Sequence, residues 1–440
     1  MKLSKNNDKF ASYYRAIEYL ESLGNIGGGY QKTDLKSHPR PEMYLERMQD
    51  FLDLLGNPER GSKYIHITGT AGKGSVAATV HNELVKAGKR SGLFTSPFTV
   101  STIEKIQVGD KYIDPLVFAD ITESIKPQID EMIKRGRHGA PSYFEMILAI
   151  ALLYFEKEEC EYVVLEVGLG GRYDATNIIK DPLVTAITNI SLDHTQILGS
   201  RTTDIAFDKA GIIKNGSQFF TTEADGRILE IFQTACEEVG AGFHPILVAG
   251  LEYDARNRIL AGHICESLGI VRSAGEIGVS PSLPARFEIM ERQPLVAIDG
   301  AHNPSKIEST IQNLTRQRYK ELSVIIAISA DKDWKTMMRM VVPLASAIYV
   351  TKFSTPNRPS VDMELLFEEA GRYASDKCSV YLNPDPVKAF HEARETLTLD
   401  DALLVVGSFY LAGDIRALYC SEEKILEQRN SCVREVSHAH

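Results

Sequence analysis

The segment that decides the fold runs Tyr64-Ile65-His66-Ile67-Thr68-Gly69-Thr70-Ala71-Gly72-Lys73-Gly74-Ser75. Its first five residues are mostly β-branched or aromatic and predict a strand, whereas Val76–Val85 has the apolar spacing of an amphipathic helix. Glycines between them allow successive backbone N–H groups to turn toward one anion, and the helix N-terminus and Lys73 add positive charge. The order strand, glycine loop, helix therefore predicts a site that holds a triphosphate.

This loop departs from the general phosphate-loop pattern at one position. That pattern has Gly-Lys followed directly by Ser or Thr, whereas Gly74 stands between Lys73 and Ser75. A glycine-rich turn between a strand and a helix also occurs without nucleotides, so the rest of the chain has to support the interpretation. The residues expected to contact the nucleotide here are Gly69, Thr70, Gly72, Lys73, Gly74 and Ser75.

From residue 63 onward, short β-branched runs alternate with longer helical patterns. The expected strands are Tyr64–Thr68, Gly92–Thr95, Tyr162–Val167, Val184–Ile190 and Phe219–Thr222, and the expected helices include Val76–Val85, Pro115–Arg135 and Ser142–Phe155. Such alternation is typical of a parallel sheet covered by helices on both faces. It predicts an α/β fold with an N-terminal P-loop-type ATPase domain built on a mainly parallel sheet.

A second alternating series follows the segment Ser280–Pro284, whose prolines and serines suit a domain linker. Its expected strands are Leu295–Asp299, Ser323–Ile328, Ala347–Thr351, Ser379–Leu382 and Ala402–Val406, with helices such as Met363–Tyr373 and Val387–Glu395. This series predicts a smaller, Rossmann-like α/β domain at the C-terminal end. We therefore expect two domains, residues 1–283 and residues 284–440.

Composition agrees with a folded two-domain enzyme. The 440 residues exceed what one hydrophobic core usually spans, and 43% hydrophobic with 25% charged residues is ordinary for a soluble protein. The net charge of −10 argues against an extended nucleic-acid surface, which needs excess Lys and Arg. The chain start lacks the apolar core of a signal peptide and no run approaches a membrane span, so we expect a cytoplasmic protein.

The cysteines show no paired spacing that would indicate a zinc site or a redox dithiol. They are scattered at Cys160, Cys236, Cys265, Cys378, Cys420 and Cys432. We expect reduced, mostly buried thiols.

Besides the phosphate loop, the chain contains eight short segments that are compared below with a known family. They are Gly92–Pro97, Ser142–Glu145, Leu165–Asn177, Leu192–Thr195, Asp208–Lys214, Asp299–Pro304, Asp331–Asp333 and Gly407–Tyr410. With the phosphate loop, this series resembles the Mur ligase superfamily, and more narrowly its folylpolyglutamate synthase and dihydrofolate synthase branch. The resemblance runs from about residue 45 to residue 416.

The resemblance implies an ATP-dependent, magnesium-requiring amide ligase. Its reaction joins L-glutamate to the carboxylate of dihydropteroate, of a reduced folate, or of both, through an acyl phosphate. Phosphoryl transfer depends mainly on positioning and electrostatics, so a metal ion and a lysine are expected at the phosphates. The resemblance also implies a protein that is usually monomeric.

Glu166 is the best candidate metal ligand from the residues alone, because it ends a buried strand at the edge where open α/β sheets bind ligands. By resemblance, the metal set is Ser75, Ser96, Glu166 and His194, and the nucleotide also contacts Asn257, Arg286 and Asp299. Taken singly, His194 has an equally simple interpretation as a structural loop histidine, and imidazole is an unusual ligand for magnesium.

The resemblance assigns the remaining roles. Lys209 can be carbamylated in this family and then acts as an acid near the metal, while His302 and Ser408 lie near the incoming glutamate. The catalytic set it implies is Lys73, Lys209, Asp299, His302 and Ser408, and the acceptor set is Phe98, Ser142, Gly170, Arg172 and Asp174.

Two positions depart from the family pattern. Ala71 replaces the usual Asn of the phosphate loop, which removes one side-chain hydrogen bond but leaves the backbone cradle. Phe98 replaces a common His next to the expected acceptor region, so the identity of the acceptor is the more open question. The alternatives are a Mur-type ligase acting on a different carboxylate and an ATP-binding regulatory protein that performs no ligation.

Overall fold

The computed structural model describes residues 8–24, 41–248, 250–271, 273, 275, 277, 281, 283–353 and 359–432. The chain folds into two compact units. The first, here the first domain, comprises Met1–Ser96 and Ile103–Pro281; the second domain comprises Pro97–Thr102 and Ser282–His440. The expected boundary after residue 283 lies close to this division, but the excursion of Pro97–Thr102 was not expected. Residues 280 and 282 of the expected linker lie outside the described residues.

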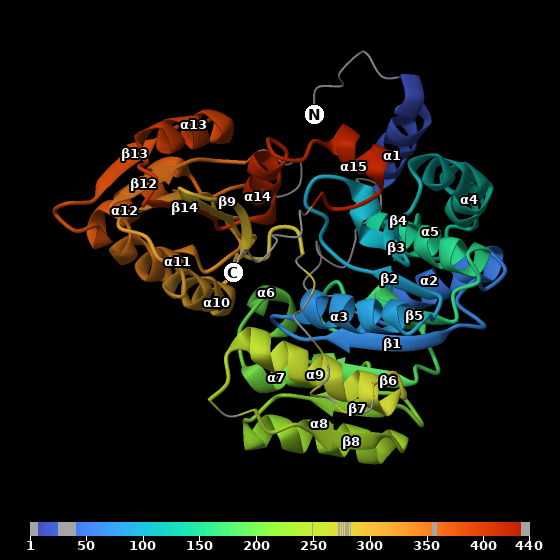
Figure 1. The fold of residues 1–440 in the computed structure, drawn as a ribbon. Coiled ribbons are helices and arrows are strands. Elements are labelled where there is room, and N and C mark those ends of the chain that lie inside the picture. Colours follow the sequence, from blue (N-terminus) through green and yellow to red (C-terminus); the bar gives the residue numbers. More distant parts are fainter. Residues whose placement is uncertain are drawn as a thin grey trace. The chain divides into compact units, whose positions relative to one another are not determined.

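An eight-stranded sheet forms the centre of the first domain (Figure 1). Its strands, in spatial order, are β4 (Lys111–Tyr112), β3 (Ile106–Val108), β2 (Ser91–Phe94), β5 (Tyr162–Glu166), β1 (Lys63–Thr68), β6 (Val184–Ile187), β7 (Gln218–Thr221) and β8 (Gly242–Pro245). From β2 to β8 all neighbours are parallel, while β3 and β4 extend the sheet antiparallel. The apolar residues of β1, β2, β5, β6 and β7 are buried, as expected for the inner strands of a sheet covered on both faces.

Helices cover this sheet. They are α1 (Ala11–Gly24), α2 (Met43–Leu54), α3 (Lys73–Lys86), α4 (Pro115–Arg135), α5 (Tyr143–Lys157), α6 (Thr195–Leu198), α7 (Thr202–Ala210), α8 (Gly226–Val239) and α9 (Tyr253–Ser267). Helix α3 packs on β2, β5 and α9, while α1, α4 and α5 contact one another. The almost wholly apolar α5 is buried along most of its length, because neighbouring elements cover it on several sides.

The second domain contains a six-stranded sheet and its own core. The strands, in spatial order, are β13 (Ser379–Leu382), β12 (Ala347–Val350), β11 (Leu322–Ile326), β14 (Ala402–Val406), β10 (Leu295–Ile298) and β9 (Glu288–Arg292). Only β9 is antiparallel among these pairs. The helices are α10 (Pro304–Thr315), α11 (Trp334–Val341), α12 (Met363–Tyr373), α13 (Pro386–Thr396), α14 (Phe409–Arg416) and α15 (Glu422–Gln428). The α/β fold with mainly parallel sheets is confirmed.

Alternation along β10 shows why this sheet has two apolar faces. Leu295 and Ala297 join the hydrophobic cluster on one face, and Val296 and Ile298 join the cluster on the other. No helix within the described ranges has both the length and the apolar character needed to cross a membrane.

One expectation about the cysteines is wrong. Cys420 and Cys432 form a disulfide, whereas Cys160, Cys236 and Cys265 are free and buried. The intervening helix α15 ends at Gln428, its C-cap Arg429 turns the backbone with a φ of 53°, and the Cα atoms of the two cysteines are 6.1 Å apart. No motif in the chain indicates this pairing, because the way the chain turns at the end of α15 brings the two cysteines together.

Candidate active site

The phosphate loop joins β1 to α3 and requires glycine at two positions. Gly69 has φ 148° and Gly72 has φ 81°, a backbone region that favours glycine. A Cβ atom at Gly69 would lie 1.8 Å from Thr188 Oγ1, and one at Gly72 would lie 2.4 Å from Asn257 Oδ1. The loop therefore fits closely between the end of β6 and helix α9, and the buried Asn257 lies beside it.

Residues that follow β6 hold the loop in shape. Thr188 Oγ1 donates to the Ala71 carbonyl (2.6 Å), and the Ala71 N–H donates to Asn189 Oδ1 (3.0 Å). Thr70 and Ser191 exchange two hydrogen bonds through the Thr70 hydroxyl. Asn189 thus supplies a side-chain amide contact to the loop at the position where Ala71 has none. These contacts also explain why β6 ends at Ile187, earlier than expected.

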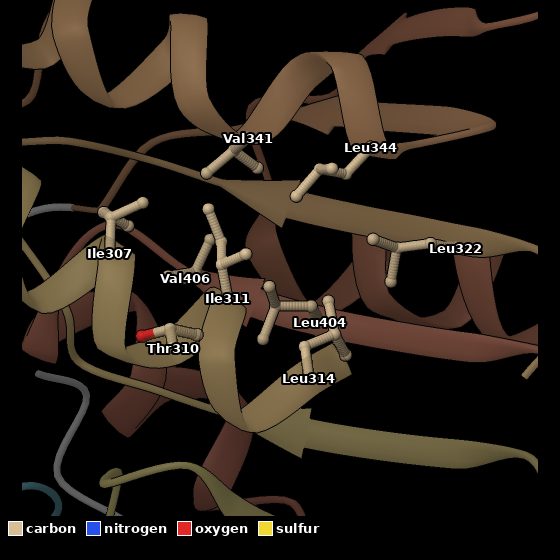
Figure 2. A pocket seen from close by; sticks show the side chains of 9 residues that line it. All are labelled: Ile307, Thr310, Ile311, Leu314, Leu322, Val341, Leu344, Leu404 and Val406. Atoms are coloured by element: carbon tan, nitrogen blue, oxygen red, sulfur yellow. The ribbon is translucent and has the colours of Figure 1, made fainter. Parts of the chain in front are cut away.

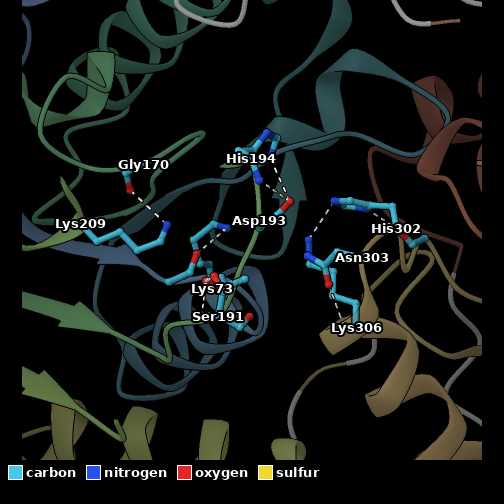
Figure 3. A network of polar contacts seen from close by, with 12 residues as sticks. Lys73, Gly170, Ser191, Asp193, His194, Lys209, His302, Asn303 and Lys306 are labelled. Atoms are coloured by element: carbon cyan, nitrogen blue, oxygen red, sulfur yellow. Dashed lines mark hydrogen bonds and ion pairs between the residues drawn. The ribbon is translucent and has the colours of Figure 1, made fainter. Parts of the chain in front are cut away.

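Lys73 is the first residue of α3, directly after its N-cap Gly72. Its ammonium donates to the Gly69 carbonyl (3.1 Å) and so lies across the loop (Figure 3). Ser75 lies in the first turn of the same helix. A lysine, a hydroxyl and the N-terminal N–H groups of a 14-residue helix are therefore gathered at one helix end, which suits a phosphate chain.

Glu166 lies at the carboxyl end of β5, opposite Ile67 of β1 in the sheet. Its side chain is buried, and Oε2 accepts a hydrogen bond from the Ser96 backbone N–H (3.0 Å). A Cβ atom at Gly74 would come within 3.2 Å of the same oxygen. The carboxylate is thus held between the first turn of α3 and the turn after β2.

His194 is held by its own loop. It has φ 50°, caps α6, and its Nε2 lies 3.8 Å from Asp193 Oδ1, which also accepts the His194 N–H (Figure 3). No cluster of three or more His, Cys, Asp and Glu side chains suited to a metal exists within the described ranges. The Glu166 carboxylate and the hydroxyls of Ser75 and Ser96 are hard oxygen donors of the kind that magnesium prefers, and the metal set expected from the sequence also includes the His194 imidazole.

Lys209 lies on α7 and is buried. Its Nζ donates to the Gly170 carbonyl (3.4 Å), as Figure 3 shows. Burial lowers the pKa of Lys209, and the nearby Lys73 ammonium lowers it further; burial also raises the pKa of Asp208. The neutral amine is therefore far more populated than on an exposed lysine.

The loop after β5 carries three of the expected acceptor residues and packs on α7. The Arg172 N–H donates to the Asp208 carbonyl (2.9 Å), and its guanidinium stacks over the Phe207 ring at 4.4 Å. Asp174 is buried: Oδ1 accepts from the N–H and hydroxyl of Thr176, and Oδ2 accepts from the Leu169 N–H. The Asp174 side chain therefore shapes the loop by accepting hydrogen bonds from Leu169 and Thr176.

The other expected acceptor residues have different surroundings. Gly170 has φ 67°, and its carbonyl also accepts from the Thr68 hydroxyl (2.7 Å). Ser142 caps α5 in a capping box with Glu145. Phe98 is half-buried and belongs to the Pro97–Thr102 segment of the second domain.

In the second domain, Asp299 follows β10 and is buried. Its carboxylate accepts from the N–H groups of Phe287 (3.1 Å) and Ala301 (2.9 Å) and from the Thr310 hydroxyl (2.9 Å). Burial raises the pKa of Asp299 to about 6, which these hydrogen bonds and the Arg286 charge oppose. Arg286 stacks over the Phe409 ring at 4.1 Å.

His302 and Ser408 follow the adjacent strands β10 and β14. The His302 ring meets the Phe409 ring edge-on at 5.7 Å, and Ser408 caps α14 by accepting the Tyr410 N–H (3.1 Å). The second domain therefore brings Asp299, Arg286, His302 and Ser408 to the carboxyl ends of neighbouring strands, where α/β sheets bind ligands.

Sequence reasoning missed four residues that structure these sites. Thr188 and Asn189 brace the phosphate loop, Phe409 contacts both Arg286 and His302, and Lys306 contacts His302. Phe409 belongs to the Gly407–Tyr410 segment, but no pattern in the sequence indicates a functional role for the other three residues.

A pocket in the second domain is lined by none of the expected site residues. Figure 2 shows it between α10 and the sheet. Its lining is apolar apart from one hydroxyl and comprises Ile307, Thr310, Ile311, Leu314, Leu322, Val341, Leu344, Leu404 and Val406. Such a lining offers no charged group for a phosphate or a carboxylate.

A parallel sheet with a phosphate loop, a carboxylate beside it and a second α/β domain defines an ATP-dependent amide ligase. Residues 67–289 match the Mur ligase middle domain, and residues 285–409 match the Mur ligase glutamate ligase domain. The chain belongs to the Mur ligase family, in its folylpolyglutamate synthase and dihydrofolate synthase branch.

Similar proteins agree over nearly the whole length. Dihydrofolate synthase/folylpolyglutamate synthase of Bacillus subtilis is 30% identical, covering 84% of this chain and 94% of the relative. Folylpolyglutamate synthase of Lacticaseibacillus casei is 28% identical, covering 84% of this chain and 93% of the relative. The structure of Mycobacterium tuberculosis folylpolyglutamate synthase with ADP has a TM-score of 0.81 at 27% identity, covering 94% of this chain and 99% of that one. The family resemblance found in the sequence is confirmed.

Proposed function

We propose that this chain attaches L-glutamate to the carboxylate of dihydropteroate, of a reduced folate, or of both. The acceptor carboxylate attacks the γ-phosphorus of ATP and ADP leaves; the glutamate amine then attacks the acyl carbon and inorganic phosphate leaves. The observation that carries the proposal is the buried Glu166 carboxylate between the first turn of α3 and the Ser96 N–H. The names of the similar proteins support the choice of substrates.

In the first domain, the phosphate loop and Lys73 hold the triphosphate, with Asn257 beside the loop. Ser75, Ser96, Glu166 and His194 would hold magnesium, which neutralises charge on the phosphate oxygens when bound. Thr188 and Asn189 keep the loop preorganised, so little reorganisation is needed when the phosphates bind.

Lys209 is proposed to carry a carbamate. A neutral amine is the form that adds to carbon dioxide, and burial favours this form by lowering the pKa of Lys209. A carbamate would place an anion close to the Lys73 ammonium, which is near enough to lower the pKa of Lys209. Protein equilibrated with ¹³C-bicarbonate should show a carbamate signal that disappears in Lys209→Met.

In the second domain, Asp299 and Arg286 are proposed to contact the nucleotide, and His302 and Ser408 to contact the incoming glutamate. Ser408 and Asp299 both follow parallel strands, and their buried side chains are fixed by backbone N–H groups. Phe98 and the loop from Gly168 to Asp174 are proposed to contact the acceptor.

The test is phosphate release and product mass with purified protein, MgATP and L-glutamate, with dihydropteroate in one reaction and tetrahydrofolate in the other. A product heavier by one glutamate in the first reaction establishes dihydrofolate synthase activity, and extension in the second establishes polyglutamylation. If folded protein that binds ATP forms no product with either acceptor, the result would favour a different acceptor. ATP binding without glutamate-dependent phosphate release from any acceptor would favour a regulatory protein.

A further inference from the structure

Lys306 contacts His302 directly, although nothing in the sequence connected the two. The Lys306 Nζ lies 3.0 Å from His302 Nε2, and His302 Nδ1 lies 2.8 Å from the Gly300 carbonyl oxygen (Figure 3). A carbonyl can only accept, so Nδ1 carries the hydrogen. Nε2 then accepts from the ammonium, which fixes His302 as the neutral Nδ1–H tautomer. Protonated His302 could not accept this bond and would bring two cations within 3.0 Å.

A rigid frame holds this pair in place. Asn303 caps α10 by accepting the Lys306 N–H (2.9 Å), and the Thr310 hydroxyl is shared between the Lys306 carbonyl and Asp299. On the other side, His302 packs edge-on against Phe409. The contact between Lys306 and His302 is thus supported by the helix cap and by the strand end that carries Asp299.

The tautomer has a consequence for substrate binding. Neutral His302 carries no charge, so it cannot supply the attraction that an amino acid with two carboxylates needs. Lys306 carries that charge, and its ammonium lies 3.0 Å from the His302 ring.

We propose that Lys306 is an amino-acid-positioning residue: it orients His302 as the neutral Nδ1–H tautomer and binds a carboxylate of the incoming glutamate. This inference rests on the proposed function and deepens it, because it assigns the positive charge of the amino-acid site to a side chain outside the recognised motifs.

The first experiment compares Lys306→Met with Lys388→Met in steady-state ligation. Lys388 is a matched control, since it is exposed and occupies the same third helical position, after an acidic or amide cap and a proline, at the start of α13. We expect the KM for L-glutamate to rise about tenfold or more in Lys306→Met only, because a charged hydrogen bond is lost. The KM values for ATP and acceptor should stay unchanged, and Lys306→Arg should recover part of the loss.

The second experiment observes His302 without turnover. In ¹⁵N-histidine-labelled protein, the signal that disappears in His302→Gln should show the Nδ1–H tautomer, and Lys306→Met should shift it toward a mixture of tautomers. Melting temperature and MgADP binding of each variant verify the fold.

The outcomes separate two ideas. Wild-type protein that extends no acceptor with glutamate overturns the proposed function, and with it the role of Lys306. Active Lys306→Met with the same KM for glutamate as Lys388→Met overturns the role of Lys306 alone, as does a His302 signal of the Nε2–H tautomer in the wild type.

Discussion

At the scale of single residues, neighbouring groups determine how a polar side chain is buried and hydrogen-bonded. Glu166 is an acid on a strand of otherwise apolar residues, yet it is buried because the strand ends beside the phosphate loop. His66, in the middle of β1, is fully buried and contacts the Thr176 hydroxyl (2.8 Å), which donates to Asp174. The Glu166 carboxylate has a hydrogen-bond partner, whereas only the Nε2 atom of His66 is paired and its buried Nδ1 atom has no hydrogen-bond partner among the described residues.

Replacement of Glu166 by Gln should abolish ligation and leave the fold intact. The amide keeps the size and can still accept from the Ser96 N–H, but it loses the negative charge that a metal ion needs. We expect glutamate-dependent phosphate release to fall by at least about a hundredfold, as when a charge that stabilises the transition state is lost. Near-normal turnover with an unchanged melting temperature would refute the metal-ligand role.

His66→Gln should make stability less sensitive to acid. Burial lowers the pKa of His66 to about 3, from the usual 6.5 of a histidine. The contribution of the neutral ring to folding stability is therefore fully present above pH 6.5 and is lost as the pH falls toward 3. Between pH 7 and pH 5 this linkage costs the wild type about 2 kcal/mol of unfolding free energy. Urea unfolding at both pH values should show a smaller decrease in the variant. An equal decrease would mean that His66 does not stay neutral when folded.

At the scale of elements, the start of helix α5 shows how one helix end stabilises the first domain. Helix α5 begins with the capping box of Ser142 and Glu145, and Glu145 also pairs with Arg47 of α2 through three hydrogen bonds. Both side chains are about 4% exposed. One carboxylate therefore caps a helix and joins two helices beside the loop that carries Asp174.

Arg47→Met should destabilise the first domain strongly, because it leaves Glu145 buried without its partner. Breaking a buried ion pair from one side typically costs about 3–5 kcal/mol. Arg90→Met is a matched control, since its pair with Glu158 is largely exposed and should contribute little. Urea unfolding measures both. The double change Arg47→Met with Glu145→Gln should recover part of the loss; equal stability of the two single variants would contradict the prediction.

At the scale of the whole molecule, the chain passes between its two domains more than once. Pro97–Thr102 leaves the first domain after β2 and belongs to the second. There the Thr99 carbonyl approaches α14 so closely that a Cβ atom at Gly413 would lie 2.2 Å from its oxygen. A glycine at 413 is therefore needed for this packing, and Phe98 is carried on the same segment.

Nucleotide binding should stabilise the whole folded molecule through the phosphate loop. A ligand that binds only the native state adds about 2.7 kcal/mol at a concentration a hundred times its Kd. We expect MgADP to raise the melting temperature of the wild type and of Lys86→Ala, and not of Lys73→Ala. Lys86 is the control because it lies at the opposite end of α3. If MgADP raised the melting temperature of Lys73→Ala as much as that of the wild type, the expected triphosphate site at the phosphate loop would be wrong.

The local patterns of the sequence determined the fold class, most of the strands and the phosphate loop. Each depends on residues close together in the chain: alternation along a strand, spacing along a helix, and glycines at a turn. The expected bounds of α4, β13, β14 and α12 agree with the structure for this reason. The order of the longer motifs also led to the Mur ligase family.

Only the tertiary structure decided which distant residues meet. Asn189 braces a loop that lacks its usual asparagine, and Lys209 is buried beside Lys73 with its pKa lowered. The disulfide between Cys420 and Cys432 likewise depends on how α15 turns. These features arise from packing between segments that come together only on folding, and burial then sets their charge and hydrogen bonding.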